Sequence, residues 1–288
     1  MFDYLSEIDF TVVDPPFLDP EFPPEHFPSH FLSDGSVVHS QMWMAQGADP
    51  KGCVIVLPHV YGSTSMEGLF VPLMASGMNV MTFHPRGMWD HDHTYSFSSA
   101  IDDVHAAVET LRSANSRDLK TWNDQSYRID PDRIAVLGLS GGGGNVAAAS
   151  CAENPNIKSA VAISPGNMEF KRAETTKSPH SRRETERRLT AGRVDLGALM
   201  ADWSEGDMER ISLLKNVPRL LSKDFLLIGA SDDQFATIDT SHKEFVRAFR
   251  AAGAERFSEV ILEADHMYLT KRIALARLVI SWLRSTGF

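Results

Sequence analysis

The chain has 288 residues, of which 43 % are hydrophobic and 23 % charged, and its formal net charge at neutral pH is −10. This length is sufficient for one large α/β domain with insertions. An acidic chain lacks the basic surface that a general nucleic-acid binder needs, so we expect no nucleic-acid partner.

The sequence shows no targeting or membrane-spanning pattern. The N-terminus has no basic segment followed by an apolar core, and no run approaches the roughly 18 apolar residues of a membrane span. We therefore expect a cytoplasmic protein without a membrane span. The two cysteines, Cys53 and Cys151, are predicted to be small buried apolar residues rather than disulfide partners or metal ligands.

The N-terminal segment differs in composition from the rest of the chain. Residues 1–30 are rich in Pro and Phe and are predicted to form an extended arm across the surface of the core. Asp34-Gly35 then predicts a hairpin turn between strands at about 29–33 and 36–45.

Short apolar runs alternate with helical patterns along the remainder of the chain. The runs lie at 54–57, 80–83, 134–137, 160–163, 225–228 and 260–262. Such alternation predicts an α/β fold whose mostly parallel sheet is covered by helices on both faces. Residues 167–220 interrupt it with a polar, helix-prone stretch. We expect a core of residues 31–166 and 221–288 and a small, mainly helical cap insert at 167–220.

The motif Gly138-Leu139-Ser140-Gly141-Gly142 lies between one apolar run and an alanine-rich helical segment. In this strand–turn–helix context, G-x-S-x-G indicates a nucleophile elbow, in which glycines two residues either side of the serine avoid a backbone collision. Ser140 is therefore predicted as the nucleophile, at the N-terminus of a helix that favours developing negative charge.

A serine nucleophile needs a base and a group that orients the base. His266 follows the last apolar run and is predicted as the base. Asp232 is predicted as the orienting acid, with the adjacent Asp233 as the alternative, because one of the two can instead cap the helix that starts near Thr237.

The oxyanion of an acyl-transfer reaction needs two donors. The backbone amide of Gly141 is predicted as one donor, and that of Tyr61, or else of Val60, as the other. Val60, Trp89, Trp203 and Met267 are predicted to contact substrate in an apolar pocket. The neighbouring His59 is interpreted as a structural histidine of the loop.

Two charged clusters in the sequence could serve other functions. Asp90-His91-Asp92-His93 is interpreted as a polar loop at the rim of the site, because consecutive residues cannot all face one metal ion; no metal is expected. Residues 168–193 carry eight Lys or Arg against four Glu, which favours a solvated helical face over a surface that steers anionic substrates.

Over about residues 30–288 the chain resembles the α/β-hydrolase fold family. The matching features are Pro58-His59, Pro85-Arg86-Gly87, the elbow, the Gly229–Asp232 stretch and Asp265-His266. Within the family it looks like the bacterial dienelactone-hydrolase and prolyl-oligopeptidase-like esterases. The resemblance implies a serine hydrolase with the triad Ser140, Asp232 and His266, and no cofactor.

The predicted function is hydrolysis of a small-molecule carboxylic ester, thioester or lactone through an acyl-enzyme. The same triad also serves C–C bond hydrolysis of a β-diketone-like substrate, or acyl transfer. A non-catalytic small-molecule-binding protein on a hydrolase scaffold is the alternative from another class. The sequence leaves the oligomeric state open.

Overall fold

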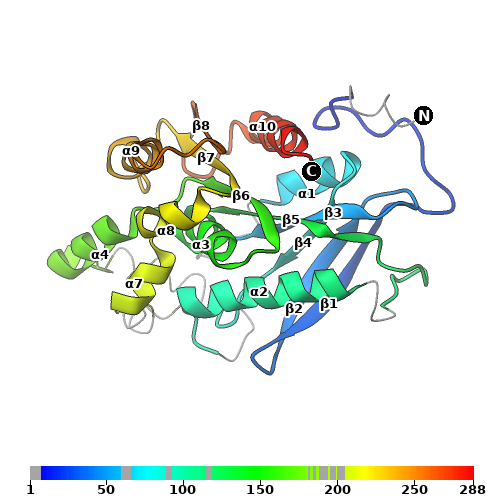
Figure 1. Cartoon of the computed structure of the whole chain (residues 1–288), viewed down its shortest axis with the longest axis horizontal. Helices are drawn as coiled ribbons and strands as arrows, with labels where there is room; N and C mark the ends of the chain where they lie inside the picture. The colour runs from blue at the N-terminus through cyan, green and yellow to red at the C-terminus, as the bar shows by residue number, and fades with distance from the viewer. Residues whose placement is uncertain are drawn as a thin grey trace.

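The computed structural model describes residues 8–59, 66–88, 93–114, 119–180, 182–183, 186–187, 194, 199 and 205–288. Within these ranges an eight-stranded sheet is covered by helices (Figure 1). In chain order the elements are β1 (Glu25–Ser33), β2 (Ser36–Met44), β3 (Lys51–Leu57), α1 (Glu67–Ala75), β4 (Asn79–Phe83), α2 (Phe97–Ser113), β5 (Ile129–Leu139), η3 (Gly141–Asn145), α3 (Val146–Glu153), β6 (Ile157–Ile163), α4 (Met168–Lys177), α7 (Glu205–Ile211), α8 (Leu213–Leu220), β7 (Asp224–Ala230), η4 (Ile238–His242), α9 (Lys243–Ala251), β8 (Phe257–Leu262) and α10 (Arg272–Ser285).

The strand order is β1-β2-β4-β3-β5-β6-β7-β8; β2 is antiparallel to both of its neighbours, β1 and β4, and the other neighbouring pairs are parallel. The predicted fold class, a mostly parallel sheet between helices, is confirmed. From β3 the chain moves outward to β4 and then returns to the other side of β3 for β5. In an open α/β sheet the crevice at such a reversal, beyond the carboxyl ends of the strands, is the usual ligand site.

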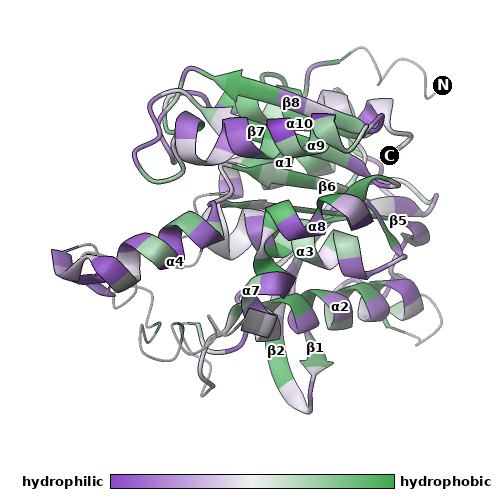
Figure 2. Ribbon diagram, turned by 60° about the vertical axis from the view of Figure 1, so that its left-hand side comes forward, coloured by the Kyte–Doolittle hydropathy of each residue, from purple (hydrophilic) through white to green (hydrophobic). Residues whose placement is uncertain are grey.

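Two apolar layers hold the sheet between helices. The layer under α1 and α10 includes Phe70 and Val279, and the opposite layer under α2, α3, α8 and α9 includes Val104 and Phe249. The inner strands are buried on both faces, which explains their uninterrupted apolar sequences (Figure 2). The six apolar runs of the sequence correspond to β3–β8.

The predicted hairpin is present between β1 and β2. Asp34 and Gly35 both have positive φ, 48° and 76°, as the tight turn of a twisted hairpin requires. β1 begins at Glu25, inside the segment predicted as an extended arm, because residues 25–33 alternate between buried and exposed faces. Pro28 is accommodated because β1 is an edge strand.

The segment between β6 and β7 contains α4, α7 and α8. The last two pack on the body of the protein, α7 against α2 and α8 against α3. Arg210 of α7 fixes this arrangement by pairing with Glu153 at 2.9 Å and Asp102 at 2.6 Å. By contrast, α4 extends away from the body (Figures 1 and 2). The division into a core and a cap at 167–220 stays a prediction.

Among the described residues no helix combines the length and the apolar character needed to cross a bilayer.

Candidate active site

Ser140 lies at the sharp turn between β5 and the helix that follows. Its φ of 66° and ψ of −168° lie in a region that non-glycine residues rarely occupy. A strained backbone at a serine that ends a buried strand is typical of a nucleophile held out from the sheet. The half-buried side chain stands at the carboxyl edge, as the sequence predicts.

Glycines allow the tight approach of backbone segments around this turn. A Cβ on Gly138 would lie 2.3 Å from the backbone of Gly143, and a Cβ on Gly143 would lie 2.8 Å from the carbonyl oxygen of Pro58. The elbow therefore packs directly against the end of β3. Because the obstacles are backbone atoms, no side-chain rotation relieves them.

The helix after Ser140 opens with the wide π-helical turn η3 and continues as α3. Gly141 begins it, and a Cβ there would lie 3.5 Å from the sulfur of Met168. Met168, the first residue of α4, is buried beside the predicted oxyanion donor. Sequence reasoning missed this methionine, because the contact joins two segments that no local pattern connects.

Asn145 links the helix that follows the elbow to two points of the segment between β6 and β7. Its side chain accepts from the amide of Gly166 at 2.8 Å and donates to the carbonyl oxygens of Gly166 at 2.9 Å and Ile211 at 3.4 Å. Buried amide groups with several partners fix one geometry, so Asn145 holds the chain after β6 and the end of α7 against the helix that follows Ser140.

His266 follows β8 and forms a buried pair with an aspartate. Nδ1 of His266 lies 2.7 Å from Oδ2 of Asp233, whose side chain is fully buried. Burial alone would raise the pKa of Asp233, but the hydrogen bond and charge of His266 and the amides of Ala236 and Phe235 outweigh it and lower the pKa. Asp233 is therefore a buried carboxylate that fixes the tautomer of His266.

This geometry corrects the choice between the two aspartates, since Asp233 and not Asp232 contacts His266. The β7–β8 ladder continues past the strands, with the amide of Asp232 donating to the carbonyl of Ala264 at 3.0 Å. Asp232 is consequently exposed, whereas the next residue enters the interior. Neither aspartate caps the following helix, because Thr237 does so through a bond from the amide of Thr240.

The loop that carries His266 is held from several sides. Asp265 accepts from the amides of Met267 and Leu269, so its carboxylate stabilises the turn and does not pair with His266. The ring of Phe235 packs edge-on against His266 at 5.1 Å between centroids. These contacts fix the imidazole plane beside the Asp233 carboxylate.

His59, after β3, is buried and electrostatically coupled to His266. Burial, followed by the charge of His266, lowers the pKa of His59 to about 4. The ring is therefore neutral at neutral pH. A buried neutral imidazole agrees with the interpretation of His59 as a structural residue of this loop.

Most of the other residues predicted to lie in the site are not described by the structure. Val60, Tyr61, Trp89, Trp203 and residues 90–92 lie outside the described residues. Met267 is described and packs half-buried against the apolar layer of α1 and α10.

His93, the remaining member of the 90–93 cluster, has its Nε2 2.8 Å from the hydroxyl of Ser36. Cys53 and Cys151 are both free and buried, as predicted.

Comparison with known proteins places this chain in a family. The alpha/beta hydrolase fold model matches residues 93–270, more than half of the chain. The protein YfhR of Salmonella typhimurium is 26% identical over 120 residues, which are 40% of this chain and 37% of that protein. The match therefore covers well under two thirds of this relative.

Solved structures of similar fold include an esterase and a peptidase. A Pyrobaculum calidifontis esterase superposes with a TM-score of 0.66 at 17% identity, covering 93% of this chain and 88% of the esterase. A Pyrococcus horikoshii acylaminoacyl peptidase gives a TM-score of 0.66 at 13% identity, covering 91% of this chain and 41% of the peptidase. At these identities the likeness concerns the fold. Since the family model spans β5–β8 and the elbow between them, the chain belongs to the α/β-hydrolase fold family.

Proposed function

We propose that the protein is a serine hydrolase that cleaves a carboxylic ester, thioester or lactone through an acyl-enzyme. The observation that carries the proposal is the buried pair of His266 and Asp233 at 2.7 Å, on the same sheet edge as the strained elbow of Ser140. A histidine oriented by a buried carboxylate and a serine held on such a turn are the parts that activate a hydroxyl.

In the proposed reaction, the Ser140 oxygen attacks the substrate carbonyl carbon while His266 accepts the hydroxyl proton at Nε2. The Asp233 carboxylate accepts a hydrogen bond from Nδ1–H and stabilises the imidazolium that forms. The tetrahedral oxyanion accepts hydrogen bonds from the Gly141 amide and from the amide of Tyr61 or Val60. His266 then protonates the departing alcohol or thiol, and the acyl group remains on Ser140.

The second half of the reaction regenerates the enzyme. Water attacks the acyl carbon while His266 accepts its proton, and collapse of the intermediate releases the acid and returns the proton to Ser140. His59 supports this cycle by staying neutral at neutral pH, so that no second positive charge competes with the imidazolium of His266.

The experiment compares wild type with Ser140→Ala on p-nitrophenyl esters from acetate to decanoate. We expect the substitution to lower kcat by about 10⁴-fold or more, since removing the nucleophile removes the covalent route. Ser231→Ala is the matched control, because this exposed serine follows β7 and its hydroxyl bonds only to Asp232 among the partners described. It should leave the rate unchanged.

The dependence of the rate on the length of the ester's acyl group reports the size of the acyl pocket. Equal rates for wild type and Ser140→Ala would contradict the proposed nucleophile. A wild type that binds small molecules tightly without turning over any ester or thioester would favour the non-catalytic binding protein instead.

A further inference from the structure

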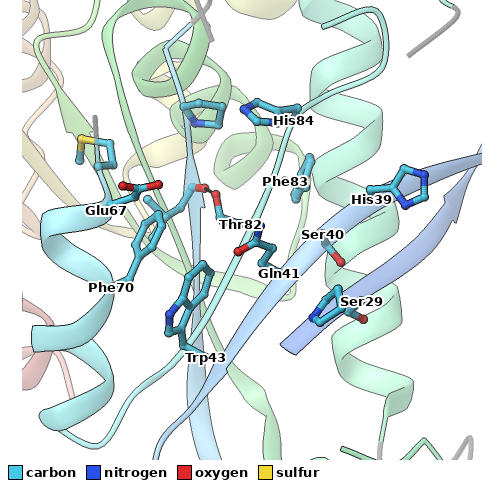
Figure 3. Close-up of a pocket in the computed structure, with 14 residues that line it drawn as sticks. Ser29, His39, Ser40, Gln41, Trp43, Glu67, Phe70, Thr82, Phe83 and His84 are labelled. Atoms are coloured by element: carbon cyan, nitrogen blue, oxygen red, sulfur yellow. Dashed lines mark hydrogen bonds between the residues drawn. The ribbon is translucent and has the colours of Figure 1, made fainter. Parts of the chain in front are cut away.

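A hollow of about 250 Å³ lies between α1 and the strands β1, β2 and β4 (Figure 3). Its lining from β3 and β4 includes Val56 and Thr82, and α1 supplies Glu67 and Phe70. The described residues that line it do not include Ser140, Asp233 or His266. The described lining is therefore distinct from these three residues, although Pro58 forms part of the wall and also touches the elbow, and Pro58 and Met66 flank the proposed oxyanion donors in the sequence.

Two aromatic rings form one wall of this hollow. Trp43 of β2 and Phe70 of α1 lie 4.6 Å apart between ring centroids and are tilted by 50°, so they meet as a wedge and not as a flat stack. His26 stacks on Trp43 at 4.2 Å and an interplanar angle of 13°. The indole is thus held in place, and its half-buried surface borders the hollow (Figure 3).

Oxygen acceptors face the same space. The carboxylate of Glu67 extends from the first turn of α1 toward Thr82 (Figure 3). The hydroxyl of Thr82 donates to the carbonyl of Val56 at 2.8 Å, which leaves the lone pairs of its oxygen available to accept.

With histidine counted as neutral, the formal charge of the hollow has one sign among the residues that the structure describes there. Glu67 is the carboxylate of the lining, two histidines, His39 and His84, also line it, and neither lysine nor arginine is among the described lining residues. An anionic ligand would meet this negative charge with no lysine or arginine to offset it. A cation would meet both a carboxylate and the half-buried ring of Trp43, which attracts positive charge through its quadrupole.

We propose that this hollow is a binding site for a small organic cation, namely an amine or quaternary ammonium group on a compact apolar body. The carboxylate of Glu67 neutralises the charge, and the wedge of Trp43 and Phe70 contacts the alkyl groups around the nitrogen. The volume restricts the ligand to a size below that of the usual drug-sized pocket.

Choline and its neutral isostere 3,3-dimethylbutan-1-ol test the proposal, because they differ only in nitrogen against carbon at the centre of the trimethyl group. Binding is measured by isothermal titration calorimetry at low ionic strength, since Glu67 is exposed and salt weakens its attraction. We expect choline to bind at least about tenfold more tightly than the isostere.

Variants locate the site and separate it from catalysis. Glu67→Gln should remove most of the preference for choline, whereas Glu255→Gln, which deletes an exposed carboxylate between α9 and β8, should keep it. Trp43→Leu should weaken the binding of both choline and the isostere. Ser140→Ala should bind choline like wild type, so failure of the proposed hydrolase function would not affect this result.

Equal affinity for the two ligands would overturn the proposal, as would absence of choline binding at millimolar concentrations. Undiminished choline binding by Glu67→Gln would also overturn it, and this exposed substitution tests the site even if Trp43→Leu fails to fold.

Discussion

The hydroxyl oxygens of Ser164 and Tyr268 are hydrogen bonded at 2.9 Å in the protein interior. Both residues have positive φ, 43° and 54°, and they link the end of β6 to the loop that carries His266. Such strain persists only where the surroundings hold it in place. The bond therefore fixes the position of the histidine loop relative to the neighbouring strands.

Tyr268→Phe removes one partner of this bond and leaves the Ser164 hydroxyl buried without it. We expect the free energy of unfolding to fall by about 1–3 kcal/mol, measured by urea denaturation. The double variant Ser164→Ala with Tyr268→Phe removes both hydroxyls and should cost less than the sum of the single variants. A Tyr268→Phe protein as stable as wild type would show that the bond does not hold the loop.

Asp233→Asn should lower kcat by about 10⁴-fold on the best ester, because the amide cannot stabilise the imidazolium and favours the wrong tautomer. Asp232→Asn is the matched control, since this neighbouring carboxylate is exposed and makes no contact with His266 among those described. Its rate should stay within about threefold of wild type. A larger loss in Asp232→Asn than in Asp233→Asn would reverse the assignment.

Arg86 and Asp103 form a buried ion pair behind the site. Asp103 is fully buried and accepts from the backbone amide of Arg86 at 2.8 Å and from its Nε at 2.7 Å. Asp103→Ala leaves the guanidinium with only the exposed Asp34 as a described acidic partner, so we expect a loss of about 3–5 kcal/mol in unfolding free energy.

The adjacent Asp102→Ala removes an exposed carboxylate that pairs with Arg210, and should cost about 1 kcal/mol or less. Urea denaturation of the two variants under identical conditions makes the comparison. Similar losses in both would contradict the importance of the buried pair.

The lowered pKa of His59 predicts how the free energy of unfolding depends on pH. Its pKa is lowered to about 4 in the folded protein, against about 6.5 in an unfolded chain. Between these values only the unfolded chain binds the proton, so the free energy of unfolding falls as pH drops from about 6.5 to 4, by a total on the order of 3 kcal/mol.

The contribution of Asp233 is lost at lower pH, since its carboxyl pKa is lowered and protonation occurs below the usual range. His59→Gln should flatten the slope between pH 6.5 and 4, as followed by urea denaturation at several pH values. An unchanged slope in this variant would assign the acid sensitivity to other groups.

The fold was predictable because its signals are local. A continuous apolar run such as Val54–Leu57 predicts a strand buried on both faces, and β3 has this environment. The Asp34-Gly35 pair specifies its hairpin through backbone preferences alone. Likewise the glycines around Ser140 reflect a steric demand that any such elbow makes.

The parts that were not predictable depend on contacts between distant segments. The orientation of Asp232 and Asp233 is set by the bond from the Asp232 amide to Ala264, which no pattern within the loop reveals. The position of Met168 beside Gly141 depends on how the insert leaves β6. β1 extends to Glu25 because its pairing with β2 outweighs the disfavour of Pro28 in a strand.

Labelling with a reagent specific for activated serines tests whether Ser140 is the nucleophile. Wild type, Ser140→Ala, Asp233→Asn and Ser164→Ala are incubated with a fluorophosphonate, and the adduct is counted by intact-mass spectrometry and located by peptide mapping. One adduct per chain is expected on Ser140 in wild type and in Ser164→Ala, with slower labelling in Asp233→Asn and none in Ser140→Ala. Labelling of Ser140→Ala at the wild-type rate, or a wild type that takes up no label, would contradict this role of Ser140.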